Sequence, residues 1–296
     1  MLTAIFYHID EFCNVLPNDS GMKLMLIDEK RERNREFRLA LSEVMTIMIY
    51  YHHSGYKTFK DYYIKHVLVA MASDFKGLVA YNRFIELKKY AALPLALFAK
   101  IGCLDDCTGI SFVDSTPLVV CHNRRIHSHK VFKSCARRGK TSLGWFYGFK
   151  LHLVINEYGQ MVDFYLTSGN VADNNHHLLL DHLLSKTQGK VFGDKGYIVK
   201  ETITNELLKR GTRLITKLKN KMKNKLMDVC DKLLLAKRGI IESVNGILKE
   251  ALSIEHSRHR SKINFIGHVH SAIAAYFFRE RKPSIVVPEA IFALET

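Results

Sequence analysis

Three acidic residues occur in this sequence where a charge is unusual. Asp114 lies inside the β-prone run SFVDSTPL, Asp194 follows the short run KVF between two glycines, and Glu242 lies in the helical pattern RGIIESVNGILKE. An acid in a buried strand is costly unless a partner compensates its charge. Functional side chains of α/β proteins gather at the carboxyl ends of strands. In the strand order expected below, the strands of Asp114 and Asp194 are neighbours, so we expect the two carboxylates to converge; a turn aspartate and a solvent-facing strand acid are the simpler alternatives.

Such a group of carboxylates has a natural ligand. Two carboxylates held ~4 Å apart repel by about 4 kcal/mol at an effective dielectric of about 20, so a fold keeps them together only with a compensating partner. Three oxygen donors with open positions suit Mg²⁺ or Mn²⁺. Two such ions can activate water and stabilise the leaving oxygen in phosphodiester cleavage. The sequence predicts a two-ion Mg²⁺ or Mn²⁺ site with Asp114, Asp194 and Glu242 as metal ligands and catalytic residues.

The segment around Glu242 carries a polar stripe. On a helical wheel, Arg238, Glu242, Asn245 and Lys249 fall on one side and apolar residues fall on the other. Arg238 and Lys249 are predicted to hold phosphates beside the metals. A surface ion pair between Arg238 and Glu242 is the alternative, but it does not explain the two strand acids.

The charge of the chain points to a polyanionic partner. Its formal net charge is +15, from 44 Lys and Arg against 29 Asp and Glu. Residues 122–150 and residues 209–225 each hold eight Lys and Arg and no acid. This pattern favours nucleic acid, with a ribosomal or chromosomal structural role as an alternative. The predicted DNA-binding residues are Arg124, Arg125, Arg137, Arg138, Lys140, Arg238 and Lys249.

Composition places the chain among globular proteins of the cell interior. No apolar run approaches the roughly 18 residues that a membrane span needs. The start MLTAIFYHIDEF has no basic region before an apolar stretch, so we expect no export signal and a cytoplasmic, nucleoid-associated protein. The paired spacing of zinc modules is absent, so buried or incidental thiols are the expected state of the cysteines considered for zinc, Cys103, Cys107, Cys121 and Cys135.

The elements that must position these residues change in type along the chain. The first hundred residues are predicted to be helical: Gly55 breaks the first helix, Thr58 caps the next, Asn82 opens a third and Pro94 ends the series. These helices suit DNA binding, of helix-turn-helix type, or a scaffold or oligomerisation module.

Strand signals dominate after residue 108. Strands are predicted at 109–120, 145–156, 161–167, 190–194 and 212–216, with helices at 174–186, 200–210 and 233–252. This order predicts an α/β fold with a ribonuclease-H-like mixed five-stranded sheet flanked by helices. The predicted domains are a helical DNA-binding domain at 1–105, a catalytic domain at 106–285 and a tail at 286–296.

The motifs FVDSTPL, GNVADNN, GDKGY and RGIIESVNGILK resemble those of DDE transposases of bacterial insertion sequences, from about residue 108 to 282. The acid-bearing helix in many of these enzymes has Tyr, two residues, Arg, three residues, Glu, six residues and Lys. Arg238, Glu242 and Lys249 match this spacing, whereas Leu235 stands in the Tyr position. The 47 residues between Asp194 and Glu242 leave no room for a large insertion domain, which indicates a compact branch.

The resemblance implies a function. It implies Mg²⁺-dependent cleavage of double-stranded terminal inverted repeats by water, then attack of the freed 3′-hydroxyl on target DNA. Synapsis of two ends implies a homodimer or larger assembly. The loop GNVADNNHH is implied to lie near the active site, so Asn170, Asp173 and His176, together with Asn245, are peripheral candidates; a loop and helix cap made by Asp173 and Asn174 is the alternative.

Three other functions remain open from the sequence. The first is a nuclease of the same fold without strand transfer, and the second is a catalytically inactive DNA-binding protein. The third uses Tyr197 or Ser115 as a covalent nucleophile, although neither has a base at a telling spacing.

Overall fold

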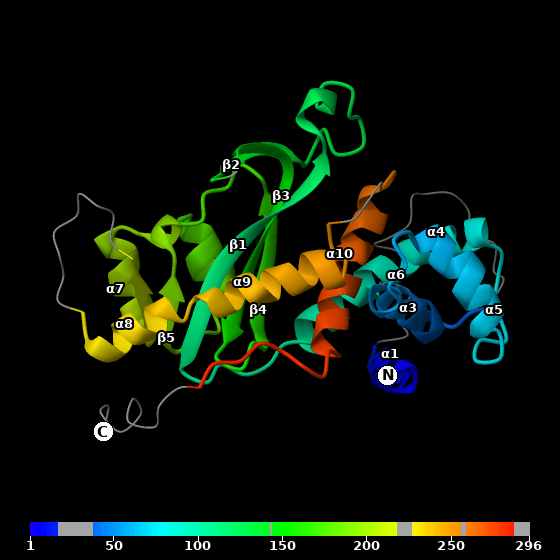
Figure 1. Ribbon diagram of the computed structural model, residues 1–296, viewed down its shortest axis with the longest axis horizontal. Helices are drawn as coiled ribbons and strands as arrows, with labels where there is room; N and C mark the ends of the chain where they lie inside the picture. Colours follow the sequence, from blue (N-terminus) through cyan, green and yellow to red (C-terminus); the bar gives the residue numbers. More distant parts are fainter. Residues whose placement is uncertain (17–37, 143, 218–226, 256–258, 287–296) are drawn as a thin grey trace. The chain divides into compact units, whose positions relative to one another are not determined.

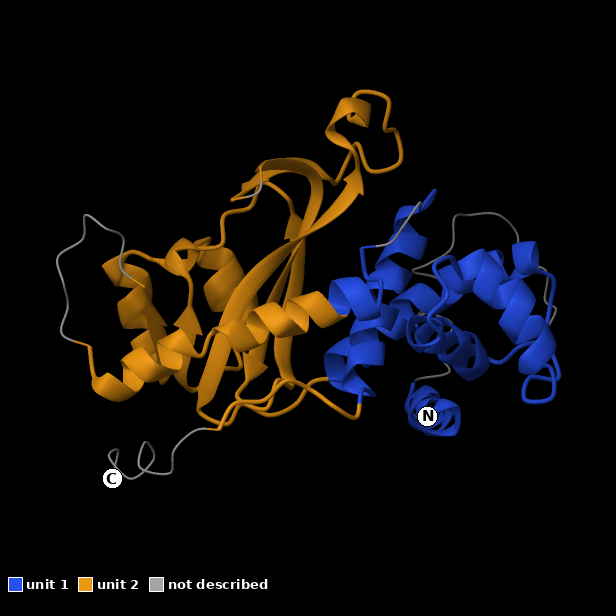
Figure 2. Cartoon of the chain, viewed as in Figure 1, with its two compact units in different colours: residues 1–103, 248–279 blue, residues 104–247, 280–296 orange. Residues whose placement is uncertain are grey.

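The computed structural model describes residues 1–16, 38–142, 144–217, 227–255 and 259–286 (Figure 1). The chain forms two compact units (Figure 2). Unit 1 comprises Met1–Cys103 and Leu248–Arg279, and unit 2 comprises Leu104–Ile247 and Glu280–Thr296. The domain boundaries expected at residues 105 and 285 stay predictions, and most of the expected tail lies outside the described residues.

Unit 1 is helical, as the sequence predicts for its first hundred residues. The late helix α10 packs against α6 and α3, so residues that follow Asp114, Asp194 and Glu242 in the sequence complete this unit. Its helices within the described residues are α1 (Leu2–Val15), α3 (Leu41–Tyr50), η1 (Tyr51–His53), α4 (Phe59–Tyr62), η2 (Tyr63–Val67), α5 (Leu68–Ala70), α6 (Tyr81–Ile101), most of the π-helical η6 (Ile247–Ala251) and α10 (Lys262–Phe277).

The local signals for these helices are partly confirmed. Gly55 follows η1 with a φ of +73°, a conformation that favours glycine, and the Thr58 hydroxyl accepts a hydrogen bond of 3.1 Å from the Asp61 N–H at the start of α4. The prediction that Pro94 ends the series is wrong, because α6 continues to Ile101 with Pro94 buried inside it. Proline removes one backbone hydrogen bond, but the apolar face of α6 continues past it and buries Leu95 and Phe98.

Unit 2 contains a mixed sheet with the ribonuclease-H-like arrangement. The order is β2-β3-β1-β5-β6, and β4 pairs with β3. Neighbours β1, β5 and β6 are parallel, whereas β3 is antiparallel to β1, β2 and β4. The strands are β1 (Ile110–Cys121), β2 (Arg137–Thr141), β3 (Gly144–Asn156), β4 (Met161–Ser168), β5 (Gly189–Gly193) and β6 (Thr212–Thr216). All five predicted strands are therefore present.

Strand β2 is an addition to the predicted sheet, and it lies in the basic segment 122–150. Its sequence RRGKT has none of the apolar alternation that signals a strand. Pairing with one half of the free edge of β3 holds it in place, while β4 pairs with the other half. Only glycine fits at position 139, because a Cβ there would lie 2.2 Å from the carbonyl oxygen of Gly169.

Helices cover both faces of the sheet. Val113 of β1 joins a core with η4 (Leu178–Leu183) and α7 (Glu201–Lys209). The next residue, Asp114, faces the other side, where α9 (Gly239–Gly246) crosses β1 (Figure 1). The long helix predicted at 233–252 is interrupted: α8 (Val229–Ala236) ends before a turn at 237–238, and α9 then begins at Gly239, a residue of low helix propensity.

No helix within the described residues is long and apolar enough to cross a bilayer. All six cysteines are free thiols. The second basic segment, 209–225, lies outside the described residues from residue 218 onward.

Candidate active site

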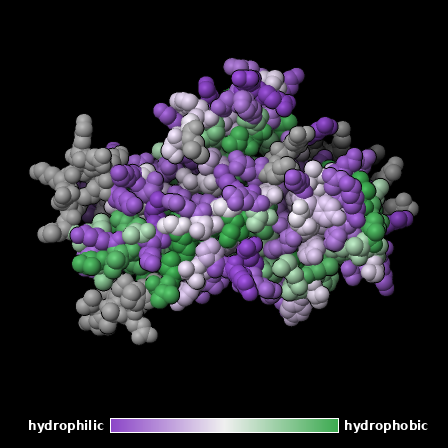
Figure 3. All heavy atoms as spheres, in the orientation of Figure 1, coloured by the Kyte–Doolittle hydropathy of each residue, from purple (hydrophilic) through white to green (hydrophobic). Residues whose placement is uncertain are grey.

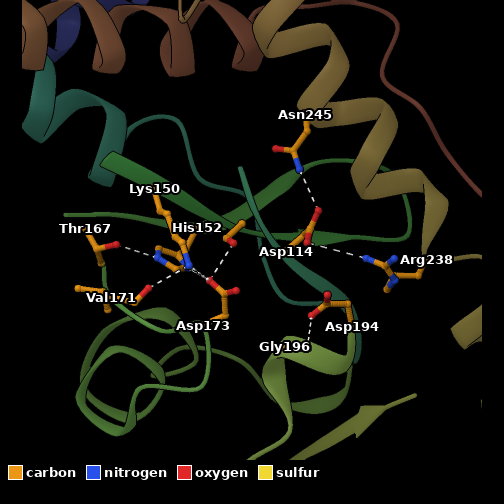
Figure 4. A network of polar contacts seen from close by, with 11 residues as sticks. Asp114, Lys150, His152, Thr167, Val171, Asp173, Asp194, Gly196, Arg238 and Asn245 are labelled. Carbon is orange, nitrogen blue, oxygen red and sulfur yellow. Dashed lines mark hydrogen bonds and ion pairs between the residues drawn. The ribbon is translucent and has the colours of Figure 1, made fainter. Parts of the chain in front are cut away.

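Asp114 and Asp194 belong to neighbouring strands, as predicted. Strand β5 runs parallel to β1, with Ile110 opposite Lys190 and Phe112 opposite Phe192. Because β5 ends at Gly193, Asp194 lies at its carboxyl end, next to the part of β1 that carries Asp114 (Figure 4). The parallel pairing therefore brings two acids that are far apart in the sequence to one edge of the sheet.

The carboxylate of Asp114 is largely buried, and its side chain is only 20% exposed. Asn245 Nδ2 donates a hydrogen bond of 3.2 Å to Oδ2, and Arg238 Nη1 lies 3.9 Å from Oδ1. Burial raises the pKa of Asp114 to about 6, Arg238 opposes this shift, and the charges of Asp194 and Glu242 add to it. The site thus holds more negative charge than Arg238 neutralises.

Asp194 is held by its own turn. Its Oδ1 accepts a hydrogen bond of 2.7 Å from the N–H of Gly196, at the start of the short helix η5 (Lys195–Tyr197). The carboxylate is therefore fixed relative to the backbone at the end of β5.

Glu242 is oriented differently from the two strand acids. Its side chain is 61% exposed, and Oε1 lies 2.9 Å from Arg238 Nη2. Arg238, Glu242 and Asn245 share one side of this helical segment, as the helical wheel predicts. Arg238 lies near the carboxylates of both Asp114 and Glu242. Lys249 belongs to unit 1 and forms an ion pair of 3.0 Å with Glu255.

Asp173 is the peripheral candidate that the fold brings to the carboxylates. Its Oδ1 accepts hydrogen bonds from Ser115 Oγ at 2.8 Å and Lys150 Nζ at 3.0 Å. Asn170 accepts a hydrogen bond from Ser168 at the end of β4, and His176 is exposed with its ring next to that of His177. The alternative that Asp173 caps a helix does not hold, because Asn175 provides the side-chain acceptor for Leu178 N–H at the start of that helix.

Two buried polar residues beside Asp173 were missed from the sequence as site residues. Lys150 and His152 alternate in the apolar run GFKLHLVIN of β3, so they point to the same face of the sheet. His152 is fully buried and pairs with Thr167 at 2.9 Å. Burial lowers its pKa to about 4, against the pull of Asp173. The sequence does contain a signal for these two residues: a lysine and a histidine two positions apart in an apolar strand indicate a polar site on one face of the sheet.

The environments of Tyr197 and Ser115, the two alternative nucleophiles, do not favour covalent catalysis. Tyr197 is buried, and burial together with Asp173, Asp114 and Asp194 raises the pKa of its hydroxyl well above the ordinary value. Ser115 donates its hydroxyl to Asp173, whose charge Lys150 neutralises. Neither side chain has an environment that favours its ionised form.

The basic segment 122–150 presents most of its cations to solvent. Arg124 and Arg125 are exposed in the short helix η3 (Asn123–Arg125), and Figure 3 shows mostly hydrophilic residues over the segment that projects beyond β1 and β2. Arg138 and Lys140 lie 5.4 Å and 5.7 Å from the ring of exposed Trp145. Lys150, the last of the eight cations in this segment, is instead buried in strand β3.

The donor atoms at this edge suit a divalent cation. Asp114, Asp194 and Glu242 offer only hard carboxylate oxygens, which Mg²⁺ and Mn²⁺ prefer. Burial is the main cause of the raised pKa of Asp114, and a bound cation would stabilise the ionised form of this carboxyl. The described residues contain no group of three or more His, Cys, Asp or Glu already arranged around one metal position, because Glu242 turns toward Arg238.

Comparison with known protein families identifies the family of the chain. Residues 104–262 match a protein-family model described as a transposase DDE domain. None of the curated proteins compared with the chain matches it. The matched range includes β1, β5 and α9, which carry the three acids.

Proposed function

The chain belongs to the transposase DDE domain family, and we propose that it cuts DNA at the terminal inverted repeats of its own element and joins the freed ends to target DNA. Family membership implies transposase activity and hence action on DNA. The observation that carries the finer proposal is that Asp194, at the carboxyl end of β5, lies beside the stretch of the parallel strand β1 that carries Asp114, with Arg238 as the cation nearest Asp114.

We assign Asp114, Asp194 and Glu242 as ligands of two Mg²⁺ or Mn²⁺ ions. When bound, such ions supply an activated water and stabilise the leaving oxygen of a phosphodiester. Asn245 orients the Asp114 carboxylate through its 3.2 Å hydrogen bond. Arg238, beside both Asp114 and Glu242, supplies a fixed guanidinium to which a phosphate oxygen can bind.

The DNA backbone is proposed to pass over the exposed cations of the basic segment. Phosphate contacts of this kind position the duplex but carry little sequence information. End recognition is assigned to the helical first hundred residues, and synapsis of two ends requires at least a homodimer. Asn170 and His176 stay candidates for the periphery of the active site, and Lys249 stays a predicted DNA-binding residue.

The experiment uses duplexes that carry the inverted repeats flanking the reading frame. We expect Asp114→Ala, Asp194→Ala and Glu242→Ala each to abolish Mg²⁺-dependent cleavage, because each removes an oxygen ligand. Binding of the same duplex in Ca²⁺, whose looser coordination does not enforce the Mg²⁺ geometry, should change little. Glu201→Ala, an exposed acid on α7, is the matched control and should cut like the wild type.

The outcomes separate the competing functions. Wild-type cleavage by any of the three variants would remove that residue from the site. Cleavage without joining of the 3′-hydroxyl to a second duplex would identify a nuclease instead of a transposase. Binding without any metal-dependent cleavage would identify an inactive DNA-binding protein.

A further inference from the structure

Asp173 is tied to two strands of unit 2 although it lies in a loop. Its Oδ1 accepts from Ser115 of β1 at 2.8 Å and from Lys150 of β3 at 3.0 Å (Figure 4). Lys150 Nζ also donates to the carbonyl of Val171 at 3.0 Å, so the same ammonium holds the loop at two points. Because Lys150 is buried, its ammonium needs partners of this kind, and the loop supplies both of them.

The bond to Ser115 acts on the strand that carries Asp114. Ser115 and Asp114 are consecutive in β1, so their side chains point to opposite faces of the sheet. Asn245 and Arg238 hold Asp114 from one face, while Asp173 holds Ser115 from the other. The backbone that bears Asp114 is thereby fixed from both sides.

Asp173 also borders the turn of Asp194. A Cβ built on Gly196 would lie 2.9 Å from Oδ1 of Asp194 and 3.2 Å from Oδ2 of Asp173. The two carboxylates therefore face one small space, and Asp173 uses Oδ1 for Ser115 and Lys150 while Oδ2 faces that space. Burial and the charges of both carboxylates raise the pKa of the Tyr197 hydroxyl, which agrees with their closeness.

We propose that Asp173, held in place by its 3.0 Å contact with Lys150, is a positioning residue of the active site that sets the placement of Asp114 through Ser115 and that of Asp194 across Gly196. This inference rests on the proposed function of the carboxylate site. Partners behind metal ligands orient them, and losing such a partner commonly costs about 10-fold to 100-fold in metal affinity or activity.

The test compares Asp173→Ala, Asp173→Asn and Ser115→Ala in the full chain. We expect Asp173→Ala to weaken Mn²⁺ binding, measured by calorimetry without DNA, by about 10-fold or more, and to raise the Mg²⁺ concentration needed for half-maximal cleavage. Asn keeps an acceptor for Ser115, so Asp173→Asn should recover part of both losses. Ser115→Ala leaves no unpaired charge, so it keeps the test valid if Asp173→Ala fails to fold.

A buried ion pair at the other end of β5 provides the control. Asp231 lies 3.1 Å from Lys190 and 3.6 Å from Arg213 and is fully buried. Asp231→Asn should lower the melting temperature, because it removes the carboxylate charge from a buried ion pair, but it should not change Mn²⁺ affinity in the folded protein.

Three results would overturn the proposal. The first is wild-type Mn²⁺ affinity and cleavage in folded Asp173→Ala, and the second is a loss of DNA binding alone, which would make Asp173 a DNA contact. The third is an effect on stability alone, as expected for Asp231→Asn. Failure of the proposed function is distinguishable, because Asp114→Ala and Asp194→Ala would then retain cleavage.

Discussion

Gly196 separates the carboxylates of Asp194 and Asp173 with no side chain of its own. Its N–H holds Asp194 Oδ1 at 2.7 Å, so that carboxylate cannot move away without losing the hydrogen bond. A Cβ at 2.9 Å from the same oxygen is closer than protein packing allows. The φ of Gly196 is not in the left-handed region, so the backbone conformation does not demand glycine. Gly196, the second glycine of the GDKGY motif, is required because the Asp194 carboxylate leaves no space for a Cβ atom.

We predict that Gly196→Ala reduces Mg²⁺-dependent cleavage by about 100-fold, because displacing a reacting group by about 1 Å has costs of that size. The melting temperature should shift by only a few degrees, since the methyl group displaces side-chain ends. Gly246→Ala is the control, because nothing lies within 4 Å of its added Cβ. Equal cleavage by Gly196→Ala and the wild type would show that Asp194 is not held where catalysis needs it.

Helix α6 buries a lysine in the core of unit 1. The side chain of Lys88 is almost inaccessible, and Nζ lies 3.7 Å from the centre of the Phe59 ring. Burial lowers the pKa of Lys88 to about 7. The pKa of Lys88 is therefore lower in the folded protein than in the unfolded chain. The free-energy cost of burying the charged side chain is complete below about pH 7 and disappears as pH rises toward about 10.5.

We predict that Lys88→Met increases the free energy of unfolding at pH 7 by on the order of 3 kcal/mol. The gain should shrink steadily between pH 7 and pH 10, because the wild type regains stability there. Urea unfolding at several pH values measures this, with exposed Lys89→Met as the control. A gain that is the same at pH 7 and pH 10 would mean that Lys88 is not the titrating group.

Over the whole molecule, the net charge of +15 favours association with any polyanion. The structure assigns different tasks to cations that the sequence groups together. Lys150 is buried with Asp173, Arg238 is shared by two acids, and Arg124, Arg125 and Arg138 face solvent. Only the exposed cations are free to exchange counterions for phosphates.

We predict that Ala at Arg124, Arg125, Arg137 and Arg138 weakens binding of terminal-repeat and scrambled duplexes alike. The slope of log K against log salt should become shallower by about 0.9 for each phosphate that the variant no longer neutralises. The control removes four exposed lysines elsewhere, Lys76, Lys186, Lys232 and Lys237. An unchanged slope, or weaker binding of the terminal repeat alone, would exclude the segment as a sequence-independent grip on DNA.

The sequence by itself determined the five main strands, the helical character of the first hundred residues and the three candidate acids. These features depend on local patterns: alternation in β1 and β3, helical spacing near Glu242, and glycines around Asp194. The family match over residues 104–262 agrees with the resemblance drawn from the same motifs.

Only the tertiary structure decided how the elements combine. Strand β2 exists because β3 offers it a free edge, α6 continues through Pro94 because its apolar face is buried, and α10 packs with helices more than a hundred residues earlier. Asp173 likewise meets Ser115 and Lys150, while Glu242 turns toward Arg238. The physical reason is common to all: each outcome depends on contacts between residues far apart in the chain, which no local pattern records.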